Sequence, residues 1–233
     1  MQLSERLLAA VGLVTRGNRV ADIGCDHAYT SIYLCRQGIA PSAIAADVHP
    51  GPLLRAKQNV ELYGLTEQIS LRLSDGLASF SEGEADTLLL TGMGGLLMLN
   101  ILSEFPDVTA SAKELVLQPQ SEVVLVRHWL HNSGYKITME RMIKEEEKFY
   151  VLIHAVKTDV LQHYEQECYY VYGKELAIED RKVFGEFLAR EKKLREEVLL
   201  KLSVQETKKT KEREQELQQE LLLIKAAALA HKL

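Results

Sequence analysis

Short apolar runs alternate with longer amphipathic segments between positions 2 and 132 of the chain. The runs are five to seven residues long, which is the pattern of strands that are buried on both faces of a parallel sheet. The alternation therefore predicts an α/β fold with a doubly wound parallel sheet. The predicted strands cover 19–23, 42–48, 69–73, 86–90 and 114–119, and the predicted helices cover 2–13, 27–37, 51–63, 95–104 and 121–132.

The pattern changes after Gly134. Residues 135–145 and 148–157 follow each other without room for a helix between them, so they predict an antiparallel hairpin added to the sheet. A dehydrogenase's dinucleotide-binding fold would continue with another βαβ half instead. Five parallel strands closed by an antiparallel pair resemble the seven-stranded, Rossmann-like sheet of the class I S-adenosylmethionine-dependent methyltransferases.

The segment 159–233 has a different composition, rich in Lys, Glu, Gln and Leu. Apolar residues recur there at helical spacing, and one set at spacings of 4, 3 and 4 forms the seam of a coiled coil. A polar stretch, Ser203–Arg213, separates the two apolar seams. We therefore predict two domains, 1–158 and 159–233, the second an antiparallel coiled-coil hairpin. One long helix that pairs with another chain is the alternative. The seam residues are Leu217, Leu221, Ile224 and Ala228.

Charge and cysteine content narrow the possible functions. The net charge is −5, all of it within residues 1–156, so any contact with nucleic acid must use local patches. Three cysteines without CxxC spacing argue against a disulfide framework or a zinc site, and no metal is predicted. No apolar stretch approaches the roughly 20 residues that span a bilayer. With no signal peptide in its first residues, we expect a cytoplasmic protein without a membrane partner.

The turn ADIGCDHAYT, residues 21–30, follows a predicted strand and precedes a predicted helix, which is the context of a nucleotide site. Gly24 allows a ligand to approach the backbone closely, because it has no Cβ. Asp26 stands where a diphosphate site would need a small residue, so the turn favours a ligand without phosphate, such as S-adenosylmethionine. Asp26 as a plain helix cap is the alternative. Cys25 is expected to pack in the turn, although it is also a nucleophile candidate.

Further acidic and glycine-rich positions follow the next strands. Asp47 ends the second strand, and its spacing from Gly24 suits an acid that binds the ribose hydroxyls of an adenosine cofactor. Asp75-Gly76 is expected to meet the adenine edge, or else to be an ordinary turn. Thr91–Gly95 contains three glycines at the carboxyl end of the fourth strand, which implies that a ligand approaches the backbone closely there. Met93 in this segment either takes part in function or only packs.

Seven segments together resemble the bacterial tRNA (adenine-22-N1)-methyltransferase family. The resemblance covers residues 1–156, and the helical tail is similar to that family's coiled-coil appendage. Thr30 and Thr91 depart mildly from the family pattern. The segments are LSERL (3–7), DIGCDHAYT (22–30), DVHPGPLLRAKQN (47–59), DGL (75–77), GMGG (92–95), LVLQPQ (115–120) and EEEKFYVLI (145–153).

The resemblance implies methyl transfer from S-adenosylmethionine to N1 of an adenine, position 22 in the D-arm region of tRNA. N1 of neutral adenine carries a lone pair, so the attack needs alignment rather than prior deprotonation. The product is cationic, which a nearby carboxylate such as Asp26 would stabilise. N1 lies on the Watson–Crick edge, so the base must be unpaired or flipped out. The predicted catalytic residues are Asp26, Gly92 and Met93.

The remaining predictions concern binding. The cofactor-binding residues are predicted to be Asp22, Gly24, Cys25, His27, Tyr29, Asp47, Val48, Asp75, Gly76, Thr91 and Gly92. The residues predicted to bind the substrate are Arg6, His27, Tyr29, Gly94, Lys208, Lys209 and Lys211.

Several of these assignments have plainer alternatives. His27 is equally suited to a structural role, and Arg6 to a surface salt bridge. Lys208, Lys209 and Lys211 lie among glutamates, so a solvated loop is the alternative to a phosphate clamp. A second small basic group, at 192–195, has the same ambiguity.

Two other functions fit the sequence less well. One is a methyltransferase for a small molecule or protein, which would not need the helical tail. The other is a non-catalytic binding module that uses the tail. The oligomeric state is predicted to be a monomer or a weak homodimer.

Overall fold

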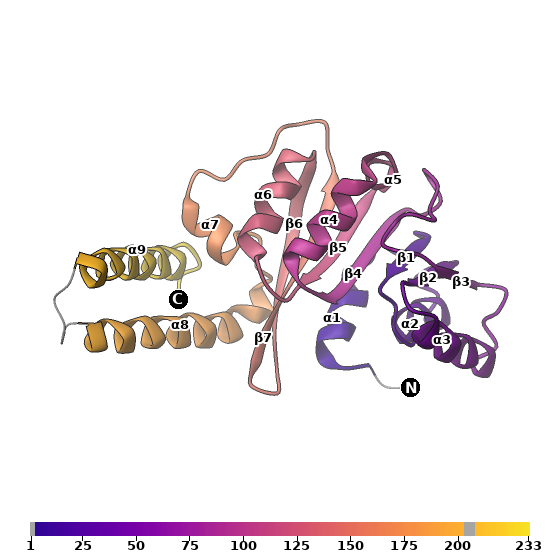
Figure 1. The fold of residues 1–233 in the computed structure, drawn as a ribbon, viewed down its shortest axis with the longest axis horizontal. Helices are drawn as coiled ribbons and strands as arrows, with labels where there is room; N and C mark the ends of the chain where they lie inside the picture. Colours follow the sequence, from indigo (N-terminus) through magenta and orange to yellow (C-terminus); the bar gives the residue numbers. More distant parts are fainter. Residues whose placement is uncertain (1–2, 203–207) are drawn as a thin grey trace. The chain divides into compact units, whose positions relative to one another are not determined.

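The computed structural model describes residues 3–202 and 208–233 and forms two compact units, residues 1–162 and 163–233. The first unit contains one seven-stranded sheet in the order β3-β2-β1-β4-β5-β7-β6 (Figure 1). Strands β1 to β5 run parallel, and the β6–β7 hairpin joins β5 in antiparallel pairing, as predicted. The strands are β1 (Val20–Ile23), β2 (Ala43–Asp47), β3 (Ile69–Leu73), β4 (Thr87–Met93), β5 (Glu114–Pro119), β6 (Tyr135–Glu145) and β7 (Lys148–Lys157).

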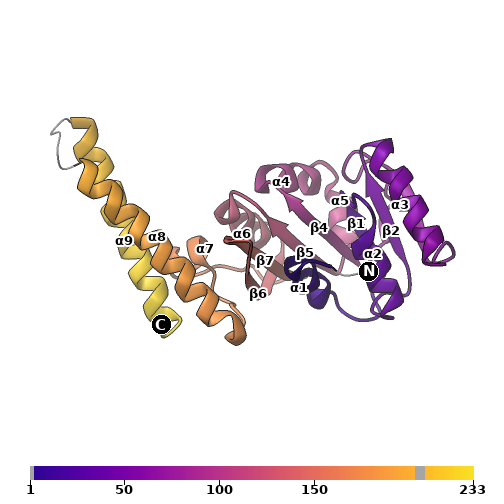
Figure 2. The ribbon, with the colours of Figure 1, turned by 90° about the horizontal axis from the view of Figure 1, so that it is seen from below.

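Helices cover both faces of this sheet (Figure 2). Helices α1, α2 and α3 pack on one face, and α4, α5 and α6 pack together on the other. The short α5 follows Phe105 and was not predicted from the sequence. The helices are α1 (Glu5–Leu13), α2 (Tyr29–Arg36), α3 (Pro50–Leu62), α4 (Gly95–Glu104), α5 (Pro106–Ser111) and α6 (Val123–Asn132).

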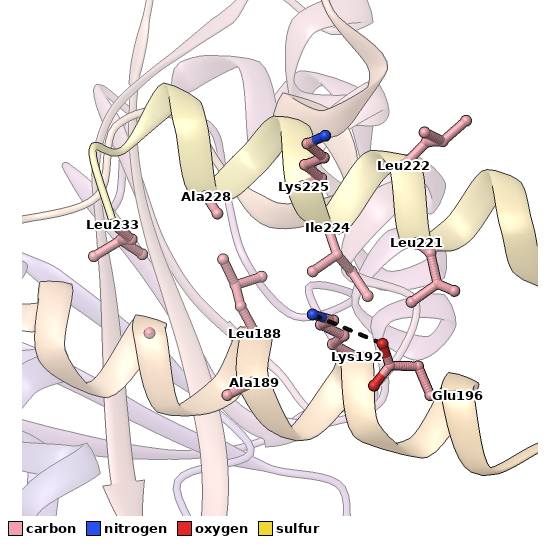
Figure 3. Close-up of a pocket in the computed structure, with 11 residues that line it drawn as sticks. Leu188, Ala189, Lys192, Glu196, Leu221, Leu222, Ile224, Lys225, Ala228 and Leu233 are labelled. Carbon is pink, nitrogen blue, oxygen red and sulfur yellow. Dashed lines mark ion pairs between the residues drawn. The ribbon is translucent and has the colours of Figure 1, made fainter.

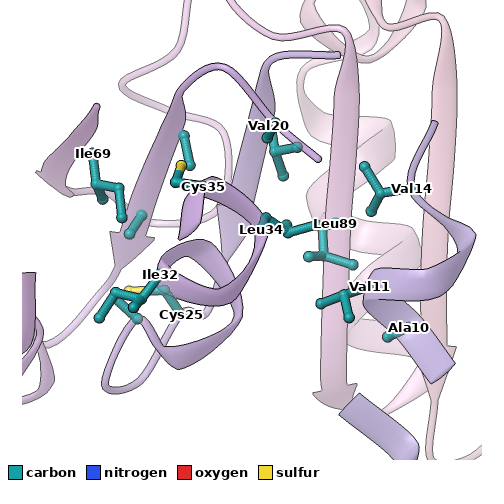
Figure 4. Close-up of a cluster of buried hydrophobic side chains, with 14 of the residues drawn as sticks. Ala10, Val11, Val14, Val20, Cys25, Ile32, Leu34, Cys35, Ile69 and Leu89 are labelled. Carbon is teal, nitrogen blue, oxygen red and sulfur yellow. The ribbon is translucent and has the colours of Figure 1, made fainter. Parts of the chain in front are cut away.

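The core under α1 and α2 is apolar and closely packed (Figure 4). Val11 of α1 and Leu34 of α2 meet Leu89 of the central strand β4, and all three side chains are buried. Cys25 and Cys35 lie in the same cluster. Burying these side chains removes apolar surface from water, at about 25 cal/mol per Å². The core therefore fixes α1 and the β1–α2 turn against the sheet.

The amino edge of the sheet holds a buried carboxylate in a dense hydrogen-bond network. Glu114, the first residue of β5, accepts from the Thr15 N–H (2.9 Å), the Thr15 hydroxyl (2.5 Å), the Thr87 hydroxyl (2.6 Å) and His154 Nε2 (3.0 Å). Burial alone would raise the pKa of Glu114, but the bonds from His154, Thr15 and Thr87 outweigh it and lower the pKa to about 2. This network ties the segment after α1 to β4, β5 and β7.

The second unit contains α7 (Glu167–Tyr172), a 3₁₀ turn (Ile178–Asp180), α8 (Arg181–Leu202) and α9 (Lys208–Ala230). Helices α8 and α9 pack as an antiparallel pair, which confirms the predicted hairpin over the single long helix. Arg195 of α8 and Glu220 of α9 form an ion pair across it at 2.7 Å. The polar stretch 203–213 includes the start of α9: residues 208–213 are helical, and 203–207 lie outside the described residues.

Candidate functional site

The turn between β1 and α2 is held by backbone bonds in a strained form. The N–H groups of Gly24 and Cys25 both donate to the Ala46 carbonyl at 2.9 Å. Gly24 has φ +73°, and Asp26 and Ala28 adopt φ of +51° and +59°, which L-residues rarely do. The N-cap residue of α2 is Ala28, which has no side-chain capping bond, so Asp26 is not the cap of this helix. Its carboxylate is instead mostly exposed and lies 3.3 Å from His27 Nε2.

A pocket of about 220 Å³ opens beside this turn, at the carboxyl ends of β1 and β4. It brings together nine of the residues predicted from the sequence. Leu7 and Thr30 complete the wall, and neither was in the predicted site. The nine are Arg6, Asp22, Gly24, Cys25, Asp26, His27, Tyr29, Thr91 and Gly92.

One wall of the pocket is a bulge at the end of β4. The pairing of β4 with β5 shifts between Thr91 and Met93, and Gly92 there has φ +77°. The Gly92 N–H donates to Gln118 Oε1 at 3.0 Å, and the Met93 carbonyl accepts from the Gln120 N–H at 3.0 Å. A side chain thus holds the N–H group that the bulge has moved out of the regular ladder.

Gln118 also holds Arg6. Arg6 Nη1 donates to the same Oε1 at 3.0 Å, and Gln118 is 1% exposed. Its Nε2 is buried without a hydrogen-bond partner in the described chain. Gln118 was not among the predicted site residues because it stands inside an apolar strand run, where nothing distinguishes a buried bridging amide.

Arg6 has further contacts on its outer side. Its Nε lies 3.7 Å from Glu145 Oε2, and its guanidinium lies over the Tyr150 ring, 5.5 Å from the centroid. Glu145 Oε1 in turn accepts from the N–H of Glu5 at 2.8 Å, at the start of α1. The salt bridge considered as the alternative for Arg6 therefore exists, but the same side chain also lines the pocket.

Asp22 and Cys25 both line the pocket, and burial raises the pKa of each. Burial raises the pKa of Asp22 to about 6, although the Ser31 hydroxyl, which donates to Asp22 Oδ2 at 2.7 Å, partly offsets this. Burial and the nearby Asp22 and Asp47 carboxylates raise the pKa of the Cys25 thiol. A buried thiol whose pKa is raised is unreactive, which leaves Cys25 as a packing residue of the turn.

Asp47 is linked to the pocket through the backbone. The carboxylate accepts from the His49 N–H at 2.9 Å and from the Asp26 N–H at 3.3 Å, so it couples the ends of β1 and β2. Val48 beside it is 50% exposed. Neither residue lines the pocket itself.

The two positions predicted after β3 also lie outside the pocket. Asp75 is exposed. Gly76 has φ +52°, and a Cβ there would lie 3.0 Å from Ile101 Cγ1 of α4. The packing against α4 is thus sufficient reason for a glycine at 76.

Met93 and Gly94 lie at the junction of β4 and α4. A Cβ on Gly24 would lie 3.0 Å from Met93 Cε, so the Met93 side chain reaches the turn after β1. Gly94 precedes α4, and a Cβ there would lie 3.2 Å from the Ser121 hydroxyl. Both are placed at the edge of the site, although neither lines the pocket.

The predicted basic residues of the tail belong to the second unit. Lys208, Lys209 and Lys211 lie in the first turns of α9, and Lys208 pairs with Glu212 at 4.0 Å. At 192–195 the cations pair with glutamates of α8 itself, with N–O distances of 3.7 Å, 3.9 Å and 2.8 Å. These basic groups are thus parts of charged helix surfaces, not a solvated loop.

A larger cavity of about 620 Å³ lies between α8 and α9 (Figure 3). Leu188, Leu221 and Ile224 line it, and the Lys192–Glu196 pair lies along its side. It contains none of the predicted site residues, and its wall is mainly apolar.

Within residues 3–202 and 208–233, no group of three or more His, Cys, Asp or Glu side chains is arranged to hold a metal ion. None of the helices described in these ranges has the length and apolar character needed to cross a membrane.

The chain matches known proteins over most of its length. Residues 3–153 match the family model described as a methyltransferase domain. The tRNA (adenine(22)-N(1))-methyltransferase of Bacillus subtilis is 35% identical over 210 residues, which are 90% of this chain and 83% of that enzyme.

Solved structures extend the likeness to nearly the whole chain. The crystal structure of the B. subtilis m1A22 tRNA methyltransferase TrmK is 32% identical, with a TM-score of 0.86 over 97% of this chain and 98% of that one. Streptococcus pneumoniae Sp1610 in complex with S-adenosyl-L-methionine is 32% identical, with a TM-score of 0.85 over 97% and 99% of the two chains.

Proposed function

Because this chain belongs to the family of the tRNA (adenine(22)-N(1))-methyltransferases, we propose that it transfers a methyl group from S-adenosylmethionine to N1 of an adenine in tRNA. The observation that carries the proposal is the pocket in which the Gly24 turn faces the Gly92 bulge. Position 22, in the D-arm region, is the proposed target. Action on tRNA also supports a cytoplasmic location, and we propose a monomer or a weak homodimer.

The residues around the turn fit S-adenosylmethionine. Gly24 is exposed and has φ +73°, a conformation that suits glycine, and without a Cβ it leaves the backbone of the turn open to a ligand. Asp22 and Asp26 would repel a diphosphate but tolerate a cationic sulfonium and an ammonium group. Asp47, at the end of the neighbouring strand, would hold the ribose hydroxyls, with Val48, Asp75 and Gly76 beside the adenine.

When bound, S-adenosylmethionine supplies an electrophilic methyl group. The chain's own residues then have to align N1 of the target base with it and to stabilise the positive charge that the base acquires. Asp26 is proposed for the second task, because its carboxylate lines the pocket and is held by no helix-capping bond. Gly92 and Met93 would orient the base through their backbone. His27 and Tyr29, whose rings lie 5.7 Å apart, would contact its face.

Three groups are proposed to bind the rest of the substrate. Arg6, held by Gln118 and Glu145, presents a fixed cation at the pocket wall. Gly94 allows the chain to approach closely at the start of α4. Lys208, Lys209 and Lys211 would contact phosphates of the tRNA from α9, as point charges.

The direct test is incubation with labelled S-adenosylmethionine and bulk unmodified tRNA, followed by nucleoside mapping. We expect label only in 1-methyladenosine at one position. Label in a protein or small molecule, but none in tRNA, would favour the alternative methyltransferase. Replacing Lys208, Lys209 and Lys211 by Glu should weaken tRNA methylation without changing cofactor affinity, whereas a small-molecule enzyme would be unaffected.

Calorimetry separates the cofactor from the chemistry. Asp47→Ala should weaken S-adenosylmethionine binding, whereas Asp26→Ala should bind it normally and chiefly lower turnover. If the native protein bound no S-adenosylmethionine at micromolar concentrations, a non-catalytic binding module would be the better description.

A further inference from the structure

The first turn of α4 exposes two adjacent leucines. Leu96 is 56% exposed and Leu97 is 53% exposed, whereas Met98, Ile101 and Leu102 of the same helix are buried. The helix therefore has more apolar residues than its contact with the core requires. Its first turn has no charged side chain. Two large apolar side chains in water at one helix end are a feature of binding surfaces.

These leucines stand on a rigid base. The Gly95 N–H donates to the Ser121 hydroxyl at 3.3 Å, and a Cβ on Gly95 would lie 2.4 Å from the Ser121 carbonyl oxygen. Only glycine at 95 lets α4 pack this closely on the segment before α6. The start of α4 is thus fixed to the end of β5 as well as to β4, and its side chains are held in place.

The leucines also lie at the same edge of the sheet as the pocket, because α4 begins directly after β4. Gly92 lines the pocket, and the Leu96 Cα is at most about 15 Å from the Gly92 Cα, because consecutive Cα atoms are about 3.8 Å apart. Side chains of a helix tilt toward its N-terminus, which for α4 is the carboxyl edge of the sheet. Leu96 and Leu97 therefore project to the edge at which the pocket opens.

We propose that Leu96 and Leu97 form an apolar wedge that enters the base stack of the RNA when the target adenine leaves it. The proposal rests on the proposed function, since a base that reacts at N1 must be extracted from its pair and stack. Apolar side chains inserted at a base step are a known way to offset the cost of unstacking, because they cover the exposed base faces. The partner is RNA because the leucines lie at the same edge of the sheet as the pocket that is proposed to take the base, and Leu96 follows Gly92 of the pocket wall closely along the chain.

The test combines two variants with two substrates. Leu96→Ser and Leu97→Ser are compared with Leu62→Ser, a control leucine that is 78% exposed at the end of α3. One substrate is the folded tRNA. The other is the same tRNA with an abasic residue opposite the target adenine, which lowers the energy needed to flip the base. Single-turnover methylation is measured on both, and 2-aminopurine at the target position reports unstacking on binding.

We expect each wedge variant to methylate the folded tRNA about tenfold more slowly and to give a smaller fluorescence rise. On the abasic-partner tRNA both should be close to the native protein, and Leu62→Ser should be native on both substrates. Equal rates and equal fluorescence for all variants would overturn the wedge. A native protein that methylates neither tRNA would overturn the proposed function, and the wedge with it.

Discussion

Two buried carboxylates, one at each edge of the same sheet, have opposite electrostatic environments. Asp22, near the carboxyl edge, and Glu114, at the amino edge, are both 2% exposed. Glu114 is bonded by two threonines and a histidine and has its pKa lowered to about 2. Asp22 is bonded through Ser31 and has its pKa raised to about 6, because burial outweighs that partner.

The two edges differ in whether their buried polar groups have all their hydrogen-bond partners within the part of the chain that the structure describes. At the amino edge the bonds that Glu114 accepts join strands and the segment after α1. At the carboxyl edge the turn has residues with positive φ, an amide nitrogen of Gln118 without a partner in the described chain, and acids facing a pocket. The bonded carboxylate lies at one edge, and the residues with positive φ and the unpartnered amide nitrogen lie at the other.

The strongest test of this division is Asp26→Asn. Loss of the charge that is proposed to stabilise the methylated base should slow methyl transfer about 10²- to 10³-fold in single-turnover kinetics, with the unfolding temperature unchanged. Glu82→Gln, an exposed acid of a loop, is the control and should be fully active. An unchanged rate for Asp26→Asn would remove the catalytic role of this carboxylate.

The pH dependence of the unfolding free energy should report the raised pKa of Asp22. Its pKa is higher in the folded than in the unfolded state, so its contribution is present at low pH and is lost as the pH rises from about 4 to 6. Asp22→Asn should therefore gain about 3 kcal/mol of unfolding free energy relative to the native protein between pH 4 and 7, measured by urea titration. A constant difference across this range would contradict the raised pKa.

Glu114→Gln should show the opposite behaviour. The amide of Gln keeps one acceptor oxygen, but its NH₂ group is itself a donor and cannot accept from the threonine hydroxyls or from His154. We therefore expect the free energy of unfolding to fall by about 2 kcal/mol at pH 7. The native contribution should disappear as the pH falls from about 4.5 toward 2, because the pKa is lowered in the folded state. Methyl transfer per folded molecule should not change, and Glu146→Gln, in the exposed β6–β7 turn, is the control.

The smallest expected effect comes from Gln118→Leu. This substitution tests whether methyl transfer depends on the hydrogen bond from the Gly92 bulge to Gln118. Removing Oε1 takes one hydrogen bond from Arg6, which keeps its contacts with Glu145 and Tyr150, and takes the acceptor from the Gly92 N–H. It also removes the unpartnered Nε2, so the unfolding free energy should change by less than about 1 kcal/mol. Methyl transfer should fall about tenfold, because the pocket wall is no longer positioned. Gln120→Leu, which keeps the backbone bond to Met93, should be active.

Much of the fold follows from patterns along the chain. The strands and most helices were predicted within a few residues, because a parallel sheet buries continuous apolar runs that remain visible in the sequence. Helix α5 was missed because six residues are too short to show a helical period.

The sequence by itself determined the order of strands and helices, the single glycine of the first turn and the positions of the acids that follow the strands. Their assembly depended on tertiary structure. The strand order puts β4 next to β1, so Thr91 and Gly92 face Asp26 although they are far from it along the chain. Gln118 joins Arg6 to Gly92 only because β5 lies beside β4 and α1 packs over both. A pattern along the chain records what each residue prefers, but a bridge between distant segments exists only once the sheet has brought them together.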